Sequence, residues 1–396
     1  MMVDIVTLLL TIGAGALPLP ASVLLAEVLA AYVPKRRESD SEGGVTFSIV
    51  VPAHDEAQVI ERTLIALKQS IDGQTRIIVV ADNCTDATAD IARSAGAEVV
   101  ERKNETERGK GYALAAGIKY LRADPPDVVV FFDADTIPED QAVRRLVDHA
   151  SRACRPVQAV YLLNAPADAG PRASVSALAF TTKNLVRPAG LARLGMPCHI
   201  TGSGFALPWS IASSTALASG NIVEDMQLGV DLAIAGQPVT LCESALVLGQ
   251  LPAGTDTAAT QRRRWEHGHL RTLFTQCPRL LIQAVRQVRL SLAVLALDLA
   301  VPPLALLTAG LVGMWVLACL WAATVGPSLP LWISSAGCFL LLSTVFLAWL
   351  RSGRDRIPLK SLLSVPFYVA WKLPIYAGFL LRRETVWQRT KRQGVQ

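Results

Sequence analysis

Charged residues are scarce in this sequence: Asp, Glu, Lys and Arg make up 18% of the 396 residues, against about 25% in typical soluble domains. Basic residues exceed acidic ones only slightly, 38 against 33, so the formal net charge is +5 and no nucleic-acid partner is expected. The seven cysteines are odd in number and contain no Cys-x-x-Cys pair, which argues against a zinc site or a disulfide framework and indicates reduced thiols. Apolar residues make up 51% of the chain, so a fully soluble protein is not expected.

Three long stretches carry no formal charge and are each long enough to cross about 30 Å of hydrocarbon: residues 5–26, 299–326 and 331–350. No basic residue precedes the first stretch, and Lys35, Arg36 and Arg37 follow it. This order is the reverse of a secretory signal and predicts an anchor with its N-terminus outside and its C-terminal end in the cytoplasm.

A fourth apolar stretch, residues 361–381, contains Lys372 and two prolines and is followed by a basic tail. If this stretch crossed the bilayer, the basic tail would lie outside, against the usual charge bias. We therefore expect an interfacial or re-entrant segment, with the tail on anionic lipid of the inner leaflet. A fourth membrane span is the alternative.

Between the first two stretches, short β-branched runs alternate with helical patterns. Strands are expected at 47–52, 76–82, 97–100 and 127–133, and helices at 59–70, 85–95 and 109–122. Near-continuous apolar strands that alternate with helices form a parallel sheet covered on both faces. The sequence therefore predicts an α/β fold with a mostly parallel sheet.

Acidic side chains follow three of these strands. The segments are Ala53-His-Asp-Glu56, Asp82-Asn-Cys-Thr-Asp86 and Asp133-Ala-Asp135. Each could be a helix N-cap, but ligands bind at the carboxyl ends of strands in such a sheet, where all three would meet. Together with Lys110 they favour a binding site.

Six motifs in order resemble the inverting family 2 glycosyltransferases, specifically the membrane-embedded cellulose, chitin and hyaluronan synthase-like group. Within residues 47–273 they are Val-Val-Pro-Ala-His-Asp-Glu, Ala-Asp-Asn-Cys-Thr-Asp, Arg-Gly-Lys-Gly-Tyr-Ala-Leu, Phe-Asp-Ala-Asp, Val-Glu-Asp and Gln-Arg-Arg-Arg-Trp. The resemblance implies a GT-A nucleotide-sugar-binding domain at 45–284, between an anchor at 1–34 and a membrane region at 285–396. His54 and Asp55 stand where the family more often has Tyr-Asn. The identity of the nucleobase in the donor is therefore not fixed by this motif, and a UDP-linked sugar is the first expectation.

A departing nucleoside diphosphate leaves negative charge, which a divalent cation held by hard oxygen ligands can offset. In an extended strand end, Asp133 and Asp135 would project to the same side while Ala134 turns away. The resemblance makes Asp135 the direct ligand of Mg²⁺ or Mn²⁺ and places Asp133 near the metal and the ribose.

The resemblance also implies a nucleotide pocket. Asp82 would bind the nucleobase, and the other positions of the pocket are Ala53, Asp55, Glu56 and Lys110. For Lys110 a solvated loop lysine is the alternative.

Inverting transfer requires a general base that accepts the proton of the attacking hydroxyl group. Asp225 is the candidate, at the start of a helical pattern where a carboxylate is favoured. A plain N-cap would have the same geometry, so the assignment follows from the family position, and Glu224 is the alternative base.

The acceptor side is expected at two further motifs. By resemblance Gln261, Arg264 and Trp265 contact the diphosphate or the acceptor, with the indole ring as a stacking surface. The turn Gly202-Ser203-Gly204 resembles a family loop beside the acceptor, although a plain tight turn is equally consistent.

These observations predict an inverting, metal-dependent glycosyltransferase in the cytoplasmic membrane that moves a sugar from a nucleotide-sugar donor to a growing polysaccharide. Transfer of one sugar to a lipid or lipid-linked acceptor is the first alternative, and a silent nucleotide-sugar-binding scaffold is the second. Three spans are few for a polysaccharide channel, so the first case would require the 361–381 segment, an oligomer or an export partner.

Overall fold

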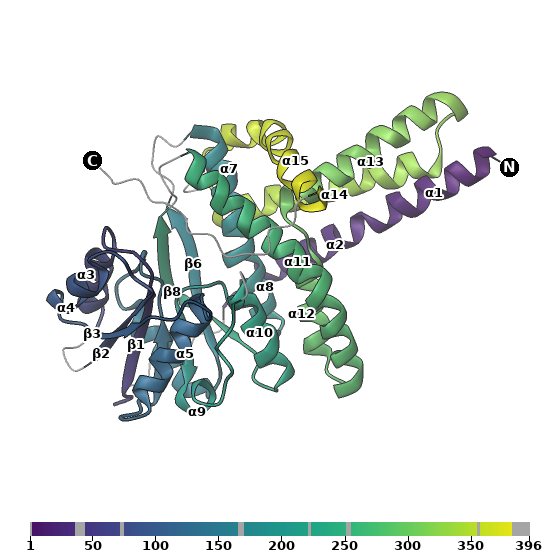
Figure 1. Ribbon diagram of the computed structural model, residues 1–396. Helices are drawn as coiled ribbons and strands as arrows, with labels where there is room; N and C mark the ends of the chain where they lie inside the picture. The colour runs from purple at the N-terminus through teal and green to yellow at the C-terminus, as the bar shows by residue number, and fades with distance from the viewer. Residues whose placement is uncertain are drawn as a thin grey trace. The chain divides into compact units, whose positions relative to one another are not determined.

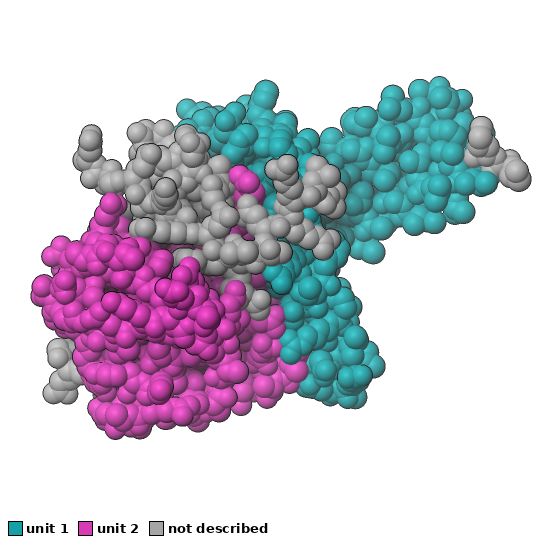
Figure 2. Space-filling view, viewed as in Figure 1, with its two compact units in different colours: residues 1–34, 165–195, 265–384 teal, residues 35–164, 196–264, 385–396 magenta. Residues whose placement is uncertain are grey.

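The computed structural model describes residues 2–35, 44–71, 75–164, 170–220, 223–250, 255–354 and 357–381. The chain divides into two compact units (Figure 2): unit 1 is residues 1–34, 165–195 and 265–384, and unit 2 is residues 35–164, 196–264 and 385–396. The units are thus interleaved along the chain, whereas the expected domains were contiguous. The basic tail lies outside the described residues.

Unit 2 contains an eight-stranded sheet with the order β3-β2-β1-β4-β7-β6-β8-β5. The strands are β1 Phe47–Ala53, β2 Arg76–Asp82, β3 Glu98–Arg102, β4 Val128–Phe131, β5 Thr136–Pro138, β6 Val157–Asn164, β7 Phe205–Pro208 and β8 Thr240–Gln250. The helices of this unit are α3 Ile60–Gln69, α4 Thr88–Ser94, α5 Lys110–Leu121, α6 Ala142–Ala153, α9 Trp209–Ala212 and α10 Glu224–Ile234. The α/β fold is therefore confirmed.

The first four strands form the expected parallel half of the sheet (Figure 1). Alternate residues of β1 face opposite sides: Ile49 lies in a buried cluster with Leu64 of α3 and Leu146 of α6. On the other face, Val50 lies so close to Gly117 of α5 that a Cβ on this glycine would be 2.6 Å from Val50 Cγ1. Burial on both faces explains why these strands are almost continuously apolar.

The sheet changes direction at β7, which pairs antiparallel with β4. Because of this reversal, β7 begins beside the end of β4: Phe205 pairs with Phe131, and their rings stack with centroids 4.6 Å apart. The loop before β7 therefore lies at the same edge as the segment after β4. The sheet is mixed, and the antiparallel strands were not foreseen from the sequence.

Unit 1 is helical. Its elements are α1 Met2–Ala16, α2 Pro18–Ala30, α7 Gly170–Thr181, the π-helix η1 Thr182–Val186, α8 Arg187–Arg193, α11 Thr255–Gln287 (from residue 265 on), α12 Leu290–Ala300, α13 Leu304–Val325, α14 Leu329–Ser352, the 3₁₀ helix η2 Leu359–Ser364 and α15 Val365–Leu381. Helix α14 packs against α1, α2 and α13, and these four run alongside one another in Figure 1.

Four helices among the described residues are long and apolar enough to cross a membrane: Val3–Ala30, Leu304–Val325, Leu329–Ser352 and Leu359–Phe379. The second begins five residues later than the expected stretch, because Pro302 and Pro303 separate it from α12. The fourth contains Lys372, which is buried and forms an ion pair with Glu266 of α11. This pairing compensates the charge of Lys372, whereas Lys360, the other charged residue of that helix, is exposed at its start.

A buried ion triad joins three helices of unit 1. The Arg187 guanidinium of α8 donates to Glu27 of α2 at 2.9 Å and to Asp298 of α12 at 2.5 Å. All three residues are less than 10% exposed. Since removal of one member would leave a buried charge without its partner, the triad fixes α8 against the end of α2.

Candidate active site

The segment Asp133-Ala-Asp135 lies directly after β4, in the turn that leads to β5. The turn replaces the extended strand end expected from the sequence, because the chain changes neighbours here: β5 pairs with β8 instead of β1. Ala134 is buried in the core and its carbonyl oxygen accepts a hydrogen bond of 2.8 Å from Thr63 Oγ1 of α3. The two aspartates are half-buried, so the turn still presents them together while Ala134 faces inward.

The loop Gly202-Ser203-Gly204 is held beside this turn. Ser203 Oγ accepts a hydrogen bond of 3.0 Å from the backbone N–H of Asp133. The buried side chain of Gln158 donates to the carbonyl oxygen of Ser203 at 2.9 Å and accepts from the N–H of Thr201 at 3.0 Å. Gln158 was missed from the sequence, where its only signal is an amide near the start of a mostly apolar strand.

Glycine is required at position 202 for two reasons. Its φ of +98° lies in the region that L side chains rarely adopt, and a Cβ there would lie 3.2 Å from Oδ2 of Asp225 and 3.9 Å from Oδ2 of Asp133. The carboxylates of Asp225 and Asp133 thus converge on the Cα of Gly202. This places the expected base near one of the expected metal-binding aspartates.

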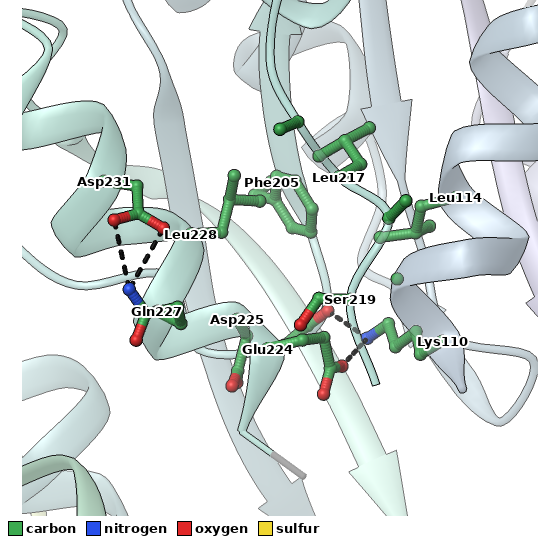
Figure 3. A pocket seen from close by; sticks show the side chains of 14 residues that line it. Lys110, Leu114, Phe205, Leu217, Ser219, Glu224, Asp225, Gln227, Leu228 and Asp231 are labelled. Carbon is green, nitrogen blue, oxygen red and sulfur yellow. Dashed lines mark hydrogen bonds and ion pairs between the residues drawn. The ribbon is translucent and has the colours of Figure 1, made fainter. Parts of the chain in front are cut away.

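Lys110, the first residue of α5, connects these groups (Figure 3). Its ammonium group donates to the carbonyl oxygen of Gly202 at 2.6 Å, forms an ion pair with Asp133 and lies 4.0 Å from Glu224 Oε1. Burial alone would lower the pKa of Lys110, but the carboxylates of Asp133 and Glu224 raise it above its ordinary value. The lysine is therefore a permanent cation between the two motifs and is not the solvated loop residue of the alternative interpretation.

Glu224 and Asp225 form the first turn of α10. Burial raises the pKa of Glu224 to about 8; Lys110 opposes this shift, and the charge of Asp225 adds to it. Burial also raises the pKa of Asp133, which Lys110 again opposes and Asp135 increases. The half-buried Lys110 ammonium thus faces the carboxyl groups of Asp133, Glu224 and Asp225, and Asp135 adds its charge beside Asp133. Burial is the main cause of the raised pKa values, and the neighbouring carboxylates add to it.

A cavity of about 280 Å³ opens beside these carboxyl groups. Figure 3 shows Glu224, Asp225 and Lys110 at one side and the apolar side chains of Phe205 and Leu228 at the other. The remaining lining residues are Gly111, Leu114, Gly202, Ala216, Leu217, Ala218, Ser219, Gln227 and Asp231.

Asp82, at the end of β2, is buried and paired. Its Oδ1 accepts hydrogen bonds from Arg102 Nη1 at 2.7 Å and from Asn83 Nδ2 at 3.1 Å. Arg102 also lies over the ring of Tyr112, 5.4 Å from its centroid. Asp82 and Arg102 are register partners in the parallel pair β2–β3. Arg102 was missed from the sequence. The signal that could have found it is a basic residue at the end of the strand next to the one that ends in Asp82.

The loop after β1 is organised by Asp55. Its carboxylate accepts hydrogen bonds from the N–H of Thr85 at 2.6 Å and the N–H of Asp86 at 3.2 Å. The N–H of Glu56 donates to Thr88 Oγ1 at 2.7 Å, and Ala53 is buried at the strand end. Because the Asp55 carboxylate is hydrogen-bonded to the backbone at 85–86, it fixes the position of the loop after β2 relative to the loop after β1.

The chain from residue 44 to residue 268 matches the model of a family described as glycosyltransferase like family 2. The chain belongs to this family. The match spans the parallel strands, the Asp133–Asp135 turn and the start of α10, so the site described above lies within the family domain.

Individual relatives of this family-2 protein are similar over shorter ranges. A probable glycosyltransferase, YdaM of Bacillus subtilis, is 35% identical over 123 residues, which are 29% of this chain and 28% of the relative. A 4,4'-diaponeurosporenoate glycosyltransferase of Staphylococcus haemolyticus is 29% identical over 123 residues, 30% of this chain and 31% of the relative. The chain thus matches about a third of the length of these curated relatives.

Among solved structures, a mannosyltransferase of Pyrobaculum calidifontis in complex with GDP-Man and Mn²⁺ is similar to the family-2 protein with a TM-score of 0.58 and 16% identity. The likeness covers 95% of this chain and all of the mannosyltransferase chain. At this identity it shows a shared fold.

The last motif of the family-2 protein lies on α11. Trp265 is half-buried and its ring centroid is 5.9 Å from that of Phe180, at an interplanar angle of 42°. Arg264 is half-buried as well, and the side chain of Gln261 lies outside the described residues. Trp265 belongs to unit 1, whereas the carboxyl groups around Lys110 belong to unit 2.

Proposed function

We propose that the protein is an inverting, metal-dependent glycosyltransferase that moves a sugar from a nucleotide-sugar donor to an acceptor at the membrane. The observation that supports this most directly is the set of three carboxyl groups, on Asp133, Glu224 and Asp225, gathered around Lys110, with Asp135 beside Asp133. A site with this charge suits a substrate that brings a cation with its diphosphate.

A divalent cation fits the donor set. Asp133 and Asp135 offer hard carboxylate oxygens from one turn, and the charge of Asp135 adds to the effect of burial in raising the pKa of Asp133. Mg²⁺ or Mn²⁺ at these residues would stabilise the charge of the departing diphosphate. The Mn²⁺ named with the Pyrobaculum mannosyltransferase supports the same assignment.

Asp225 is the proposed general base. Its neighbour Glu224, with a pKa of about 8, is mostly protonated at pH 7 and so does not readily accept another proton. Gly202 leaves open the space in front of Asp225 Oδ2, where an acceptor hydroxyl group could approach. Asp225 then takes the hydroxyl proton as the oxygen attacks the sugar.

The nucleotide lies, in this proposal, along the ends of β1 and β2. Asp82, oriented by Arg102, would accept hydrogen bonds from the base, and Ala53 and Glu56 would line the ribose side. Asp55 would act through the loop it holds.

For the acceptor we propose a growing polysaccharide, with Trp265 as the ring on which a sugar unit stacks. A lipid or lipid-linked acceptor that receives one sugar is the second candidate, favoured by the Staphylococcus relative named for 4,4'-diaponeurosporenoate. Membership of the cellulose, chitin and hyaluronan synthase-like subtype is proposed only together with the polysaccharide acceptor.

We further propose that the protein lies in the cytoplasmic (inner) membrane, with its N-terminus outside and with the family domain and the tail in the cytoplasm. A cysteine in place of Gly394, outside the described residues, should resist a membrane-impermeant thiol reagent in intact cells. Rapid labelling there would make Leu359–Phe379 a fourth span.

The experiment that tests the function incubates purified protein, in lipid nanodiscs, with a panel of nucleotide sugars and Mg²⁺ or Mn²⁺. Released nucleotide and product length are measured with glycan and with lipid acceptors. A ladder of long products supports the polysaccharide, and a single addition supports the lipid acceptor. Donor binding without turnover in every combination would favour the silent scaffold and contradict the proposal.

A further inference from the structure

One side of α15 is bonded to α11 next to the last motif. Four residues of α15, spaced three and four apart, share this side of the helix: Lys372, Ile375, Tyr376 and Phe379. They meet two successive residues of α11, Glu266 and His267, which come directly after Trp265. All of these residues belong to unit 1.

Glu266 directs both of its carboxylate oxygens at α15. Oε1 forms an ion pair with the Lys372 ammonium group, and Oε2 accepts a hydrogen bond of 3.2 Å from the Tyr376 hydroxyl group. Lys372 is 2% exposed, and its ammonium group lies 5.5 Å from the centroid of the Tyr368 ring. Because a buried ammonium group is unfavourable without a partner, Lys372 keeps Glu266 in this position.

His267 adds a second polar contact to the same helix. Its Nε2–H donates to the carbonyl oxygen of Ile375 at 2.8 Å, since a carbonyl oxygen can only accept. The imidazole ring also meets the ring of Phe379 edge to face, with centroids 5.4 Å apart. Two successive residues of α11 are thus bonded to α15, which fixes the rotation of α11 about its own axis.

This rotation determines where the ring of Trp265 lies. At 100° per residue, Glu266 and His267 are about 100° and 200° from Trp265 around the axis of α11. The middle of the side bonded to α15 is therefore about 150° from Trp265, so the indole ring is on the far side of the helix. There it is half-buried beside the ring of Phe180 in α7.

Helix α7, the other neighbour of Trp265, is attached to α15 as well. Arg172 of α7 lies over the ring of Trp371 in α15, 5.9 Å from its centroid. Val175 of α7 shares a buried cluster with Tyr376. The two helices lie side by side in Figure 1. Both elements that flank Trp265 are therefore held by α15.

We propose that Glu266 and Lys372 are positioning residues for the acceptor: their ion pair sets the rotation of α11 and so the place of the Trp265 ring on which the acceptor sugar stacks. The pair acts through Trp265 and does not itself bind the acceptor. This inference rests on the proposed function, in which Trp265 binds the acceptor. It gives a reason for a buried lysine in a helix that is otherwise apolar around it.

The test compares Lys372→Met with the original full chain in nanodiscs. The donor is the nucleotide sugar that gives most product in the panel above, and the acceptors are a β-linked glucose tetrasaccharide and a glucosyl lipid. Lys372→Met should raise the KM for the acceptor and lower the ratio of transfer to donor hydrolysis at least about tenfold. Donor affinity, measured by calorimetry, should stay within about twofold. Lys360→Met, at an exposed lysine of the same C-terminal segment, is the control and should change none of these.

Two double variants separate the ion pair from the stability of the fold. Glu266→Gln with Lys372→Met leaves no buried charge unpaired, so it carries the test if the single variant does not fold, and it should show the same loss. Glu266→Lys with Lys372→Glu restores a pair of the same total length with its charges exchanged. This variant should recover the ratio of transfer to hydrolysis to within about threefold of the original chain.

A further measurement needs no turnover. With 5-fluorotryptophan at position 265 only, the ¹⁹F resonance should shift or broaden when Lys372→Met is introduced and return toward its original position when the charges are exchanged. Lys360→Met should leave the resonance where it is. An unmoved resonance in Lys372→Met would show that the pair does not position the ring.

The outcomes also distinguish this inference from the proposed function. If the original chain transfers no sugar to any acceptor, the proposed function fails and this inference fails with it. If the original chain is active and Lys372→Met uses the acceptor equally well, this inference alone fails. Equal losses of transfer, hydrolysis and donor affinity would make the pair purely structural. Acceptor use that the charge exchange does not recover would mean that Lys372 acts other than through Glu266, and either result overturns the proposal.

Discussion

Gly202 and Asp225 are matched in shape: a methyl group on the glycine would stand 3.2 Å from Oδ2 of the aspartate. The carboxylate can keep its position only while residue 202 has no side chain. The loop before β7 and the start of α10 are therefore coupled at the point where the proposed base acts.

Gly202→Ala should push the Asp225 carboxylate aside and lower kcat about 10–100-fold, while donor affinity changes little. Steady-state kinetics and calorimetry measure the two quantities. Gly195→Ala is the control, since Gly195 has a similar φ of +69° but a Cβ added there would have no atom within 4 Å. Both variants should lose comparable thermal stability, and equal losses of activity would contradict the crowding of Asp225.

Asp225→Asn should lower transfer by about 10²–10⁴-fold, because the amide cannot accept the hydroxyl proton. Glu224→Gln should have a much smaller effect at pH 7, since the carboxyl group with a pKa of about 8 already holds its proton and glutamine resembles that form. Both variants should bind the donor nearly as well as the original chain. If Glu224→Gln proves the more damaging change, the roles of the two residues must be exchanged.

Asp135→Asn should weaken Mn²⁺ binding and abolish turnover with little change in melting temperature, because the half-buried turn residue adds little packing. Calorimetric titration with Mn²⁺ alone measures the first effect independently of activity. Asp140→Asn, a change at an exposed aspartate five residues away, is the control and should leave both unchanged. Undiminished activity in EDTA would remove the metal from the reaction.

Arg102→Met should leave the buried Asp82 carboxylate without its strongest partner and lower the free energy of unfolding by about 1–3 kcal/mol. Donor affinity should fall with it, because Asp82 is no longer oriented. Arg93→Met, which removes an exposed ion pair with Glu101, the neighbour of Arg102 in β3, should not shift the denaturation midpoint. Full donor affinity in Arg102→Met would separate Asp82 from the nucleotide.

Trp265→Ala should depress transfer far more than donor affinity, since a stacking ring contributes roughly 0.5–1.5 kcal/mol to whatever sugar lies on it. Hydrolysis of the donor by water should persist. A parallel collapse of donor affinity would place this tryptophan in the nucleotide pocket or in the fold.

The parallel half of the sheet could be predicted because local pattern and tertiary environment agree there. Phe47–Ala53 and Arg76–Asp82 are apolar along almost their whole length, and the structure buries both their faces. The same reasoning could not find β7, since Phe205–Pro208 is too short to show a period and is fixed by its pairing with β4.

The site was predictable where a motif is contiguous and unpredictable where partners are distant in sequence. Asp133 and Asp135 are recognisable from their spacing, and the convergence of Lys110 with Asp133 follows from the sheet edge. Gln158 acts on a loop 43–46 residues away, and only the pairing of β6 with β7 brings the two together.

The reversal of direction at β7 also bears on when the protein becomes active during its own synthesis. Strands β1 to β4 can pair once residue 131 has been made, so the nucleotide edge of the sheet can form early. The contact between Lys110 and Gly202 closes a loop of 92 residues, and Asp225 is added later still. A nascent chain halted before β7 would carry the aspartates proposed to bind the metal but neither the loop nor the proposed base.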